Sequence, residues 1–145
     1  MAYDKYKTGY ADGQAEEVSL EALQGAADIV TVHIPYSTSN HYFINEALLT
    51  GFAKPIYLLN TARGLVLDTA ALVRQLEAGQ VLGAALDVLE YEEQAFNNLE
   101  LDGLPPPFQY LRQSERVILT PHTAGLSHEV MEAHAQVLAR KILAL

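Results

Sequence analysis

Three residues that could do chemistry, Arg63, Glu92 and His122, each follow a short apolar run with the composition of a buried strand. Ligands of open α/β sheets bind outside the carboxyl ends of the strands. A guanidinium offers a planar, permanently charged fork that suits a carboxylate or phosphate, and an imidazole exchanges protons near neutral pH. The three residues therefore indicate an active site for a small anion rather than scattered polar positions.

The composition limits the classes of function. The chain has 145 residues, half of them hydrophobic, which is enough for one domain with its own core. Its formal net charge of −9 argues against nucleic-acid binding, which needs clustered lysine and arginine. It has no cysteine, which excludes disulfides and thiolate zinc sites. We find neither a signal peptide nor the apolar run of about 20 residues that spans a membrane, so we expect a cytoplasmic protein without membrane association.

Strand and helix signals alternate along the chain, which predicts an α/β fold with a mostly parallel sheet and flanking helices. Apolar runs predict strands at residues 28–34, 55–59, 83–88 and 117–119. Capping residues and helical spacing predict helices at residues 19–26, 45–49, 68–78 and 127–143. We interpret residues 91–115 as a long surface loop, because they contain a glycine and three consecutive prolines.

The order and spacing of several motifs resemble the D-isomer-specific 2-hydroxyacid dehydrogenases, the family of D-lactate and phosphoglycerate dehydrogenases. The motifs that carry the resemblance are Asn60-Thr61-Ala62-Arg63-Gly64, Asp87 followed by Glu92, Thr120-Pro121-His122, His33-Ile34-Pro35 and Ser37-Thr38-x-Asn40. The resemblance extends from Asp4 almost to the C-terminus. It implies an oxidoreductase that uses NAD to interconvert a D-2-hydroxy acid and a 2-oxo acid by hydride transfer.

The resemblance implies a catalytic role for each of the three residues. Arg63 would hold the substrate carboxylate and polarise the ketone. His122 would act as the acid in reduction and as the base in oxidation. Glu92 would hydrogen-bond His122 and favour its charged form. Because Glu90 and Glu93 flank Glu92, the sequence leaves open which carboxylate meets the histidine.

The resemblance also implies the contacts to NAD. Asp4 would accept hydrogen bonds from the adenosine ribose hydroxyls and so favour NAD over NADP. The loop with Ile34, Pro35 and Asn40 would pass the adenosine side of the cofactor. The nicotinamide side would be lined by Thr61, Ala62 and Arg63, with Asp87 binding the carboxamide.

The family's domain organisation predicts that the chain is only part of such an enzyme. The glycine-rich G-x-G-x-x-G turn that holds the pyrophosphate is not in the sequence. We therefore expect a C-terminal fragment, with residues 1–125 as a partial NAD-binding Rossmann domain and residues 126–145 as a helix returning to the substrate-side domain. Met1–Asp4 would end the second Rossmann strand and the central first strand would be missing, which leaves two half-sheets. We expect rearranged pairing or a homodimer to close that gap.

Other functions stay open at this point. As part of a dehydrogenase, the fragment alone would be weakly active or inactive. One alternative is an inert truncated fragment with no function of its own. The chain would instead be a non-catalytic interaction module if NAD binding served only to control a partner. His128, Glu129 and His134 superficially suggest a zinc helix, but the histidines are six residues apart rather than four, so we predict no metal site.

Overall fold

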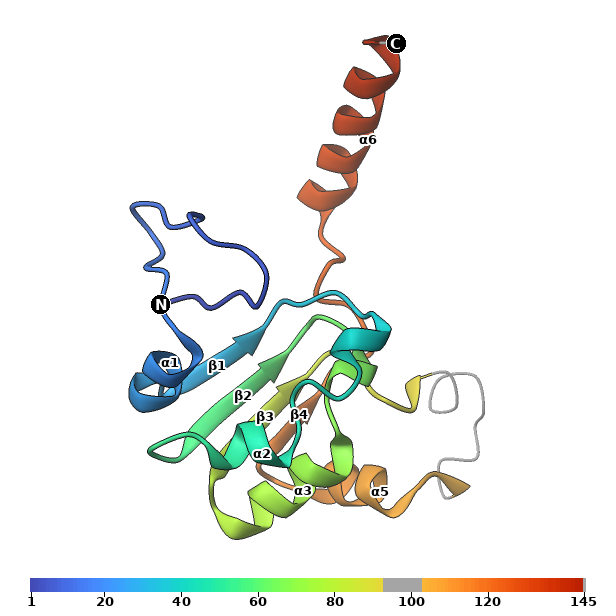
Figure 1. Cartoon of the computed structure of the whole chain (residues 1–145). Helices are drawn as coiled ribbons and strands as arrows, with labels where there is room; N and C mark the ends of the chain where they lie inside the picture. Colours follow the sequence, from blue (N-terminus) through green and yellow to red (C-terminus); the bar gives the residue numbers. More distant parts are fainter. Residues whose placement is uncertain (93–102, 145) are drawn as a thin grey trace.

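A parallel sheet of four strands forms the centre of the computed structural model, which describes residues 1–92 and 103–144 (Figure 1). The strands are β1 (Ile29–Val32), β2 (Ile56–Asn60), β3 (Val81–Leu86) and β4 (Val117–Leu119), adjacent in that order. Every neighbouring pair is parallel. The predicted α/β class with a Rossmann-like parallel sheet and flanking helices is confirmed.

Among the described helices, all but α5 (Pro106–Gln113) begin where a side chain caps the first turn. The others are α1 (Leu20–Ala26), α2 (Glu46–Thr50), α3 (Thr69–Ala78) and α6 (His128–Leu143), with short 3-10 turns η1 (Thr38–Asn40) and η2 (Gly64–Val66). Ser19, Asn45, Asp68 and Ser127 each accept a hydrogen bond from a backbone N–H in the first turn of the helix that follows. Gly79 ends α3 in the left-handed conformation that glycine adopts without strain.

The two faces of the sheet are covered unequally. Helices α2, α3 and α5 lie together on one face, where Leu58 and Leu76 belong to the buried core (Figure 1). On the opposite face Ile29, Tyr57 and Ile118 keep 64%, 49% and 66% of their surface exposed. Helix α6 projects away from the sheet and contains no buried residue (Figure 1). No helix among the described residues is long and apolar enough to cross a membrane.

The prediction of two half-sheets separated by a gap is wrong. The four strands are consecutive both in the sequence and in the sheet, so no unpaired gap lies between them. Met1–Asp4 does not join the sheet, because Ala2 forms only an isolated bridge with Glu17. The fold is incomplete at the outer edge of β1, for which the described residues provide no further strand.

The prediction of a loop over residues 91–115 is wrong for its second half. Residues 106–113 form α5, because proline is tolerated in the first turn of a helix, where its missing N–H needs no intrahelical partner. Phe108 and Leu111 are spaced to share one face of that helix, and both are buried in the core. The first half of the predicted loop, residues 93–102, lies outside the described residues.

Candidate active site

The turn after β2 presents Arg63 at the carboxyl edge of the sheet. The buried Asn60 side chain shapes this turn: its Oδ1 accepts from Ala62 N at 3.1 Å and its Nδ2 donates to Arg63 O at 3.1 Å. Arg63 itself is exposed, and its guanidinium donates to Ala62 O at 2.6 Å. Within the described residues no hydrogen bond or ion pair joins Arg63 to Glu92 or His122, so the backbone, not the guanidinium, brings them into one region.

Gly64 fastens this turn to the segment that follows β3. A Cβ atom at Gly64 would lie 2.0 Å from Leu89 O and 2.6 Å from Glu90 N, distances at which backbone atoms must move apart. Only glycine therefore allows the two backbones to approach so closely. Arg63 precedes Gly64 by one residue, and Glu92 follows Glu90 by two. The close backbone contact between Gly64 and Glu90 therefore limits how far apart Arg63 and Glu92 can lie.

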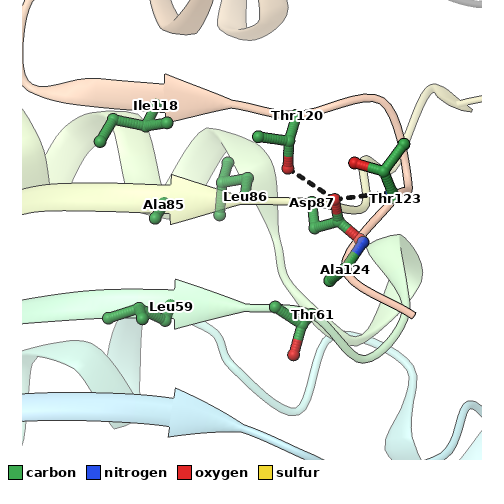
Figure 2. A pocket seen from close by; sticks show the side chains of 9 residues that line it. All are labelled: Leu59, Thr61, Ala85, Leu86, Asp87, Ile118, Thr120, Thr123 and Ala124. Atoms are coloured by element: carbon green, nitrogen blue, oxygen red, sulfur yellow. Dashed lines mark hydrogen bonds between the residues drawn. The ribbon is translucent and has the colours of Figure 1, made fainter. Parts of the chain in front are cut away.

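Asp87 holds the turn that carries His122. The buried Asp87 carboxylate accepts hydrogen bonds from Thr120 Oγ1 at 2.5 Å and from the backbone N–H groups of Thr123 and Ala124, each at 2.9 Å (Figure 2). Burial opposes ionisation of this group, but the hydrogen bonds from Thr120, Ala124 and Thr123 outweigh it, so the pKa of Asp87 lies below its ordinary value. Both carboxylate oxygens thus accept hydrogen bonds from the protein itself. The family resemblance had instead implied that Asp87 binds the carboxamide of the cofactor.

His122 is held in an uncommon backbone conformation. Its φ of 54° lies in the left-handed region, and its N–H donates to Asp87 O at 2.9 Å and Thr120 O at 3.0 Å. Such a conformation costs on the order of 1–3 kcal/mol and persists only where surrounding contacts impose it. The His122 Nδ1 pairs with Glu92 Oε1, and their side chains are 44% and 27% exposed. The histidine and carboxylate thus meet although 30 residues separate them.

The neighbouring acids have other contacts. Glu90 turns away from His122, because its Oε1 accepts from the Tyr42 hydroxyl and its Oε2 accepts from Thr69 N at 3.1 Å. Glu93 lies outside the described residues. No sequence motif assigned a role to Tyr42. The hydrogen bond to an acid 48 residues away is what identifies it as part of this region. Tyr42 is also a non-glycine residue with positive φ, 49°, as is His122.

The residues expected on the adenosine side lie on two loops that touch. Asn40 is buried and its Nδ2 donates to Pro35 O at 3.0 Å, which fixes the loop after β1. The exposed Asp4 carboxylate accepts from Tyr6 N and Lys7 N, and these hydrogen bonds lower its pKa. The Tyr6 hydroxyl donates to Ser39 Oγ at 3.3 Å, so the N-terminal loop reaches the loop of Asn40. Ile34 packs partly buried against the core.

An open cavity of about 240 Å³ lies at the carboxyl ends of β2, β3 and β4 (Figure 2). Its lining is mostly apolar near the strands and polar at the strand ends; the residues are Leu59, Thr61, Ala85, Leu86, Asp87, Ile118, Thr120, Thr123 and Ala124. Ligand sites for drug-sized molecules measure about 300–1,000 Å³, so this cavity is too small for a whole dinucleotide. Among the described residues no group of three or more histidine, cysteine or acidic side chains could hold a metal ion.

Comparisons with known proteins agree on one family. The family model of the D-isomer specific 2-hydroxyacid dehydrogenase, NAD binding domain, matches residues 1–124. A glyoxylate reductase of Thermofilum pendens is 38% identical over 130 residues, which cover 90% of this chain and 35% of that protein. A D-lactate dehydrogenase of Lactiplantibacillus plantarum is 34% identical over 128 residues, 86% of this chain and 38% of that one.

A solved structure shows the same likeness in three dimensions. The D-isomer specific 2-hydroxyacid dehydrogenase from Lactobacillus delbrueckii ssp. bulgaricus, in its NAD-complexed form, superposes with a TM-score of 0.84 at 29% identity. The match covers 98% of this chain and 45% of that chain. The chain spans 35–45% of the length of these three relatives. On its sequence and its fold, the chain belongs to the NAD-binding domain family of the D-isomer-specific 2-hydroxyacid dehydrogenases.

Proposed function

We propose that this chain is the NAD-binding portion of an oxidoreductase that interconverts a D-2-hydroxy acid and a 2-oxo acid by hydride transfer. The observation that carries the proposal is the His122–Glu92 pair, placed at the carboxyl edge of the sheet beside the cavity and the Arg63 turn. An imidazole that is oriented by a carboxylate and reachable by solvent is suited to proton transfer.

The chain's own residues would act on the substrate in two ways. His122 binds Glu92 through Nδ1, which leaves Nε2 to give a proton to the ketone oxygen in reduction and to take it back in oxidation. Arg63 is exposed, and among the described residues its guanidinium donates only to the neighbouring Ala62 O, a bond that it could exchange for the substrate carboxylate. Two parallel hydrogen bonds from the Arg63 guanidinium to the substrate carboxylate would hold the 2-oxo acid with its ketone toward His122.

The residues at the strand ends fit one half of NAD better than the other. Bound NADH would supply the hydride. The apolar cavity beside Thr61, Ala62 and Asp87 would receive the nicotinamide ring, and hydrogen bonding to its carboxamide would need Asp87 to share a carboxylate oxygen. The sequence has no glycine-rich turn for the pyrophosphate, so this chain alone is expected to bind NAD weakly.

The adenosine half would lie along the touching loops described above. Ile34, Pro35 and Asn40 would flank the adenosine. Asp4 would accept hydrogen bonds from the ribose hydroxyls, since its carboxylate is exposed and its lowered pKa keeps it charged at neutral pH. A charged carboxylate at that position would favour NAD over NADP.

The chain would divide into residues 1–125, a partial Rossmann domain, and residues 126–145, a helix that returns to a substrate-side domain. Two observations support this division: the family match ends at residue 124, and α6 buries no residue. We further propose a homodimer, because the uncovered face of the sheet exposes Ile29, Tyr57 and Ile118. The cytoplasmic location proposed for it rests on the sequence, which has no cysteine. Light scattering coupled to size-exclusion chromatography would test the dimer, and a monomer at high concentration would contradict it.

The function is tested by titrating NADH into the 145-residue chain and then following NADH oxidation with glyoxylate or pyruvate. We expect weak, saturable NADH binding and slow turnover that Arg63→Ala and His122→Gln reduce by at least about a hundredfold. Arg140→Ala and His134→Gln, on the exposed helix α6, are the matched controls and should change nothing. NADH binding without turnover would favour the non-catalytic interaction module, and the absence of any NADH binding would favour an inert fragment.

A further inference from the structure

Tyr42 and Glu90 form a contact that the proposed reaction does not use, and that contact joins the parts of the site. The Tyr42 hydroxyl donates to Glu90 Oε1 in a partly buried position. Among the described residues, no hydrogen bond or ion pair joins the Glu90 carboxyl to His122 or Arg63. Burying a carboxylate costs free energy unless hydrogen bonds compensate it. The two hydrogen bonds that Glu90 accepts offset this cost, and we ask what the partly buried carboxylate does for the site.

We propose that Tyr42 and Glu90 are positioning residues that hold the Arg63 turn and the Glu92 segment at a fixed separation. The proposal rests on the proposed function, since it assigns to that site the pair that spaces its anion-binding and proton-transfer groups. Tyr42 and Glu90 would touch neither substrate nor cofactor.

The contacts of Glu90 reach both ends of the segment that follows Arg63. Its backbone N–H lies against Gly64, where no Cβ fits, and its Oε2 accepts from Thr69 N at the start of α3. Residues 64–69 are therefore attached to Glu90 at their beginning and at their end. Glu92 follows Glu90 by two residues, so the same attachment sets where Glu92 meets His122.

Tyr42 attaches the middle of that segment. Its backbone N–H donates to Leu65 O at 3.0 Å, and two residues later Ile44 N donates to Val66 O at 2.9 Å. Tyr42 thus binds η2 through its main chain and Glu90 through its hydroxyl. It does so at a φ of 49°, a conformation that costs free energy in a bulky residue and needs surrounding contacts to persist.

The chemistry of the pair keeps it intact at neutral pH. The hydrogen bond to Glu90, together with burial, raises the pKa of Tyr42 above its ordinary value, so the phenol stays protonated and donates. Burial, the nearby Glu90 carboxylate and a hydrogen bond to it also raise the pKa of the adjacent Tyr91 to about 12.

The experiment compares Tyr42→Phe, which deletes one hydroxyl, with Tyr57→Phe on the exposed face of the sheet as the matched control. The first readout is amide hydrogen exchange, measured by NMR without any ligand on the 145-residue chain. We expect Tyr42→Phe to raise exchange at Leu67 and Thr69 at least about fivefold, to shift the Nδ1 resonance of the His122 imidazole, and to leave Leu58 in β2 unchanged. Glu90→Gln keeps one accepting oxygen and should give a smaller change.

The second readout is the affinity for oxamate, an unreactive analogue of pyruvate, in the presence of NADH. We expect Tyr42→Phe to weaken oxamate binding about tenfold, because the Arg63 turn is then held less firmly in the position that binds the carboxylate, while NADH affinity stays within about twofold. The inference would be overturned if Leu67 and Thr69 exchanged at the same rate in Tyr42→Phe as in the unsubstituted chain. It would also be overturned if exchange at Leu58 rose equally, because that would indicate general destabilisation. Failure of the unsubstituted chain to bind NADH and oxamate would count against the proposed function instead, and the exchange result would still decide the inference.

Discussion

Replacing Asp87 by asparagine tests how the turn that carries His122 is held. In the native protein Oδ1 accepts from Thr120 and Thr123, and Oδ2 accepts from Ala124. Asparagine keeps one accepting oxygen but puts an amide group, which can only donate, where the second oxygen stood. Whichever way the amide is oriented, at least one donor of the turn loses its acceptor in a buried place.

The size of the effect follows from those lost contacts. A hydrogen bond to a charged group contributes about 1.5–3 kcal/mol, and a buried donor left unpaired costs about 1–3 kcal/mol. We therefore expect Asp87→Asn to lower the free energy of unfolding by about 2–4 kcal/mol at pH 7. Because the pKa of Asp87 is lowered by folding, its contribution is fully present above its unfolded pKa of about 3.9 and is lost as the pH falls through the lower folded value.

The assay is urea unfolding of both proteins at pH 7, 5 and 3. The difference between them should be constant from pH 7 to 5 and should shrink toward pH 3. Asp28→Asn is the control, because Asp28 is an exposed carboxylate paired with Lys54, and it should change stability by no more than about 0.5 kcal/mol. Native stability of Asp87→Asn at pH 7, or a difference that grows toward pH 3, would refute the reasoning.

Three further predictions concern single substitutions, two of them paired with a control substitution. Gly64→Ala should lower the free energy of unfolding by about 1–3 kcal/mol or more, because its Cβ meets Leu89 O, whereas Gly25→Ala inside α1 should raise it by about 0.5–1 kcal/mol; urea unfolding measures both. His122→Gly should abolish NADH-dependent reduction yet change stability by less than about 1 kcal/mol, since glycine adopts its φ of 54° freely; a large loss of stability would contradict this. Leu76→Ala should cost about 2–5 kcal/mol in thermal or urea unfolding, and Leu138→Ala on the exposed helix should cost almost nothing.

Local signals predicted the individual elements well. The four apolar runs became β1 to β4, because a parallel strand buried by its neighbours needs little more than a short apolar stretch between polar ends. Asp68 and Gly79 marked the two ends of α3, since capping is decided by residues close in sequence. These features require no knowledge of the rest of the chain.

Features that depend on distant contacts could not be predicted in the same way. The three prolines before Phe108 suggested a loop, and only burial of Phe108 and Leu111 against the core decides for α5. The order of the strands likewise depends on which edges meet, which no single run encodes. The half-sheet prediction was therefore wrong although four of its strands were correct; the fifth, Met1–Asp4, does not join the sheet.

For the candidate site, too, some contacts could be predicted from the sequence and others could not. The family resemblance implied that Glu92 would meet His122, with Glu90 and Glu93 left open as alternatives, and the structure brings the side chains of Glu92 and His122 together. The motifs did not predict that Asp87 would hold the His122 turn or that Tyr42 would reach Glu90. A hydrogen bond between residues 48 positions apart leaves no periodic or spacing signal, so only the folded chain shows it.

Helix α6 has 16 residues, a serine cap and no buried side chain, so within this chain its helical structure depends almost entirely on its own backbone hydrogen bonds. Isolated helices of about 12–15 residues are only marginally stable in water. Warming should consequently melt α6 gradually, as a sloping loss of far-ultraviolet circular dichroism before the sheet unfolds. Its apolar stripe of Met131, Leu138 and Ile142 is 60–67% exposed, and a surface that covered this stripe would add the cooperativity that the helix lacks alone.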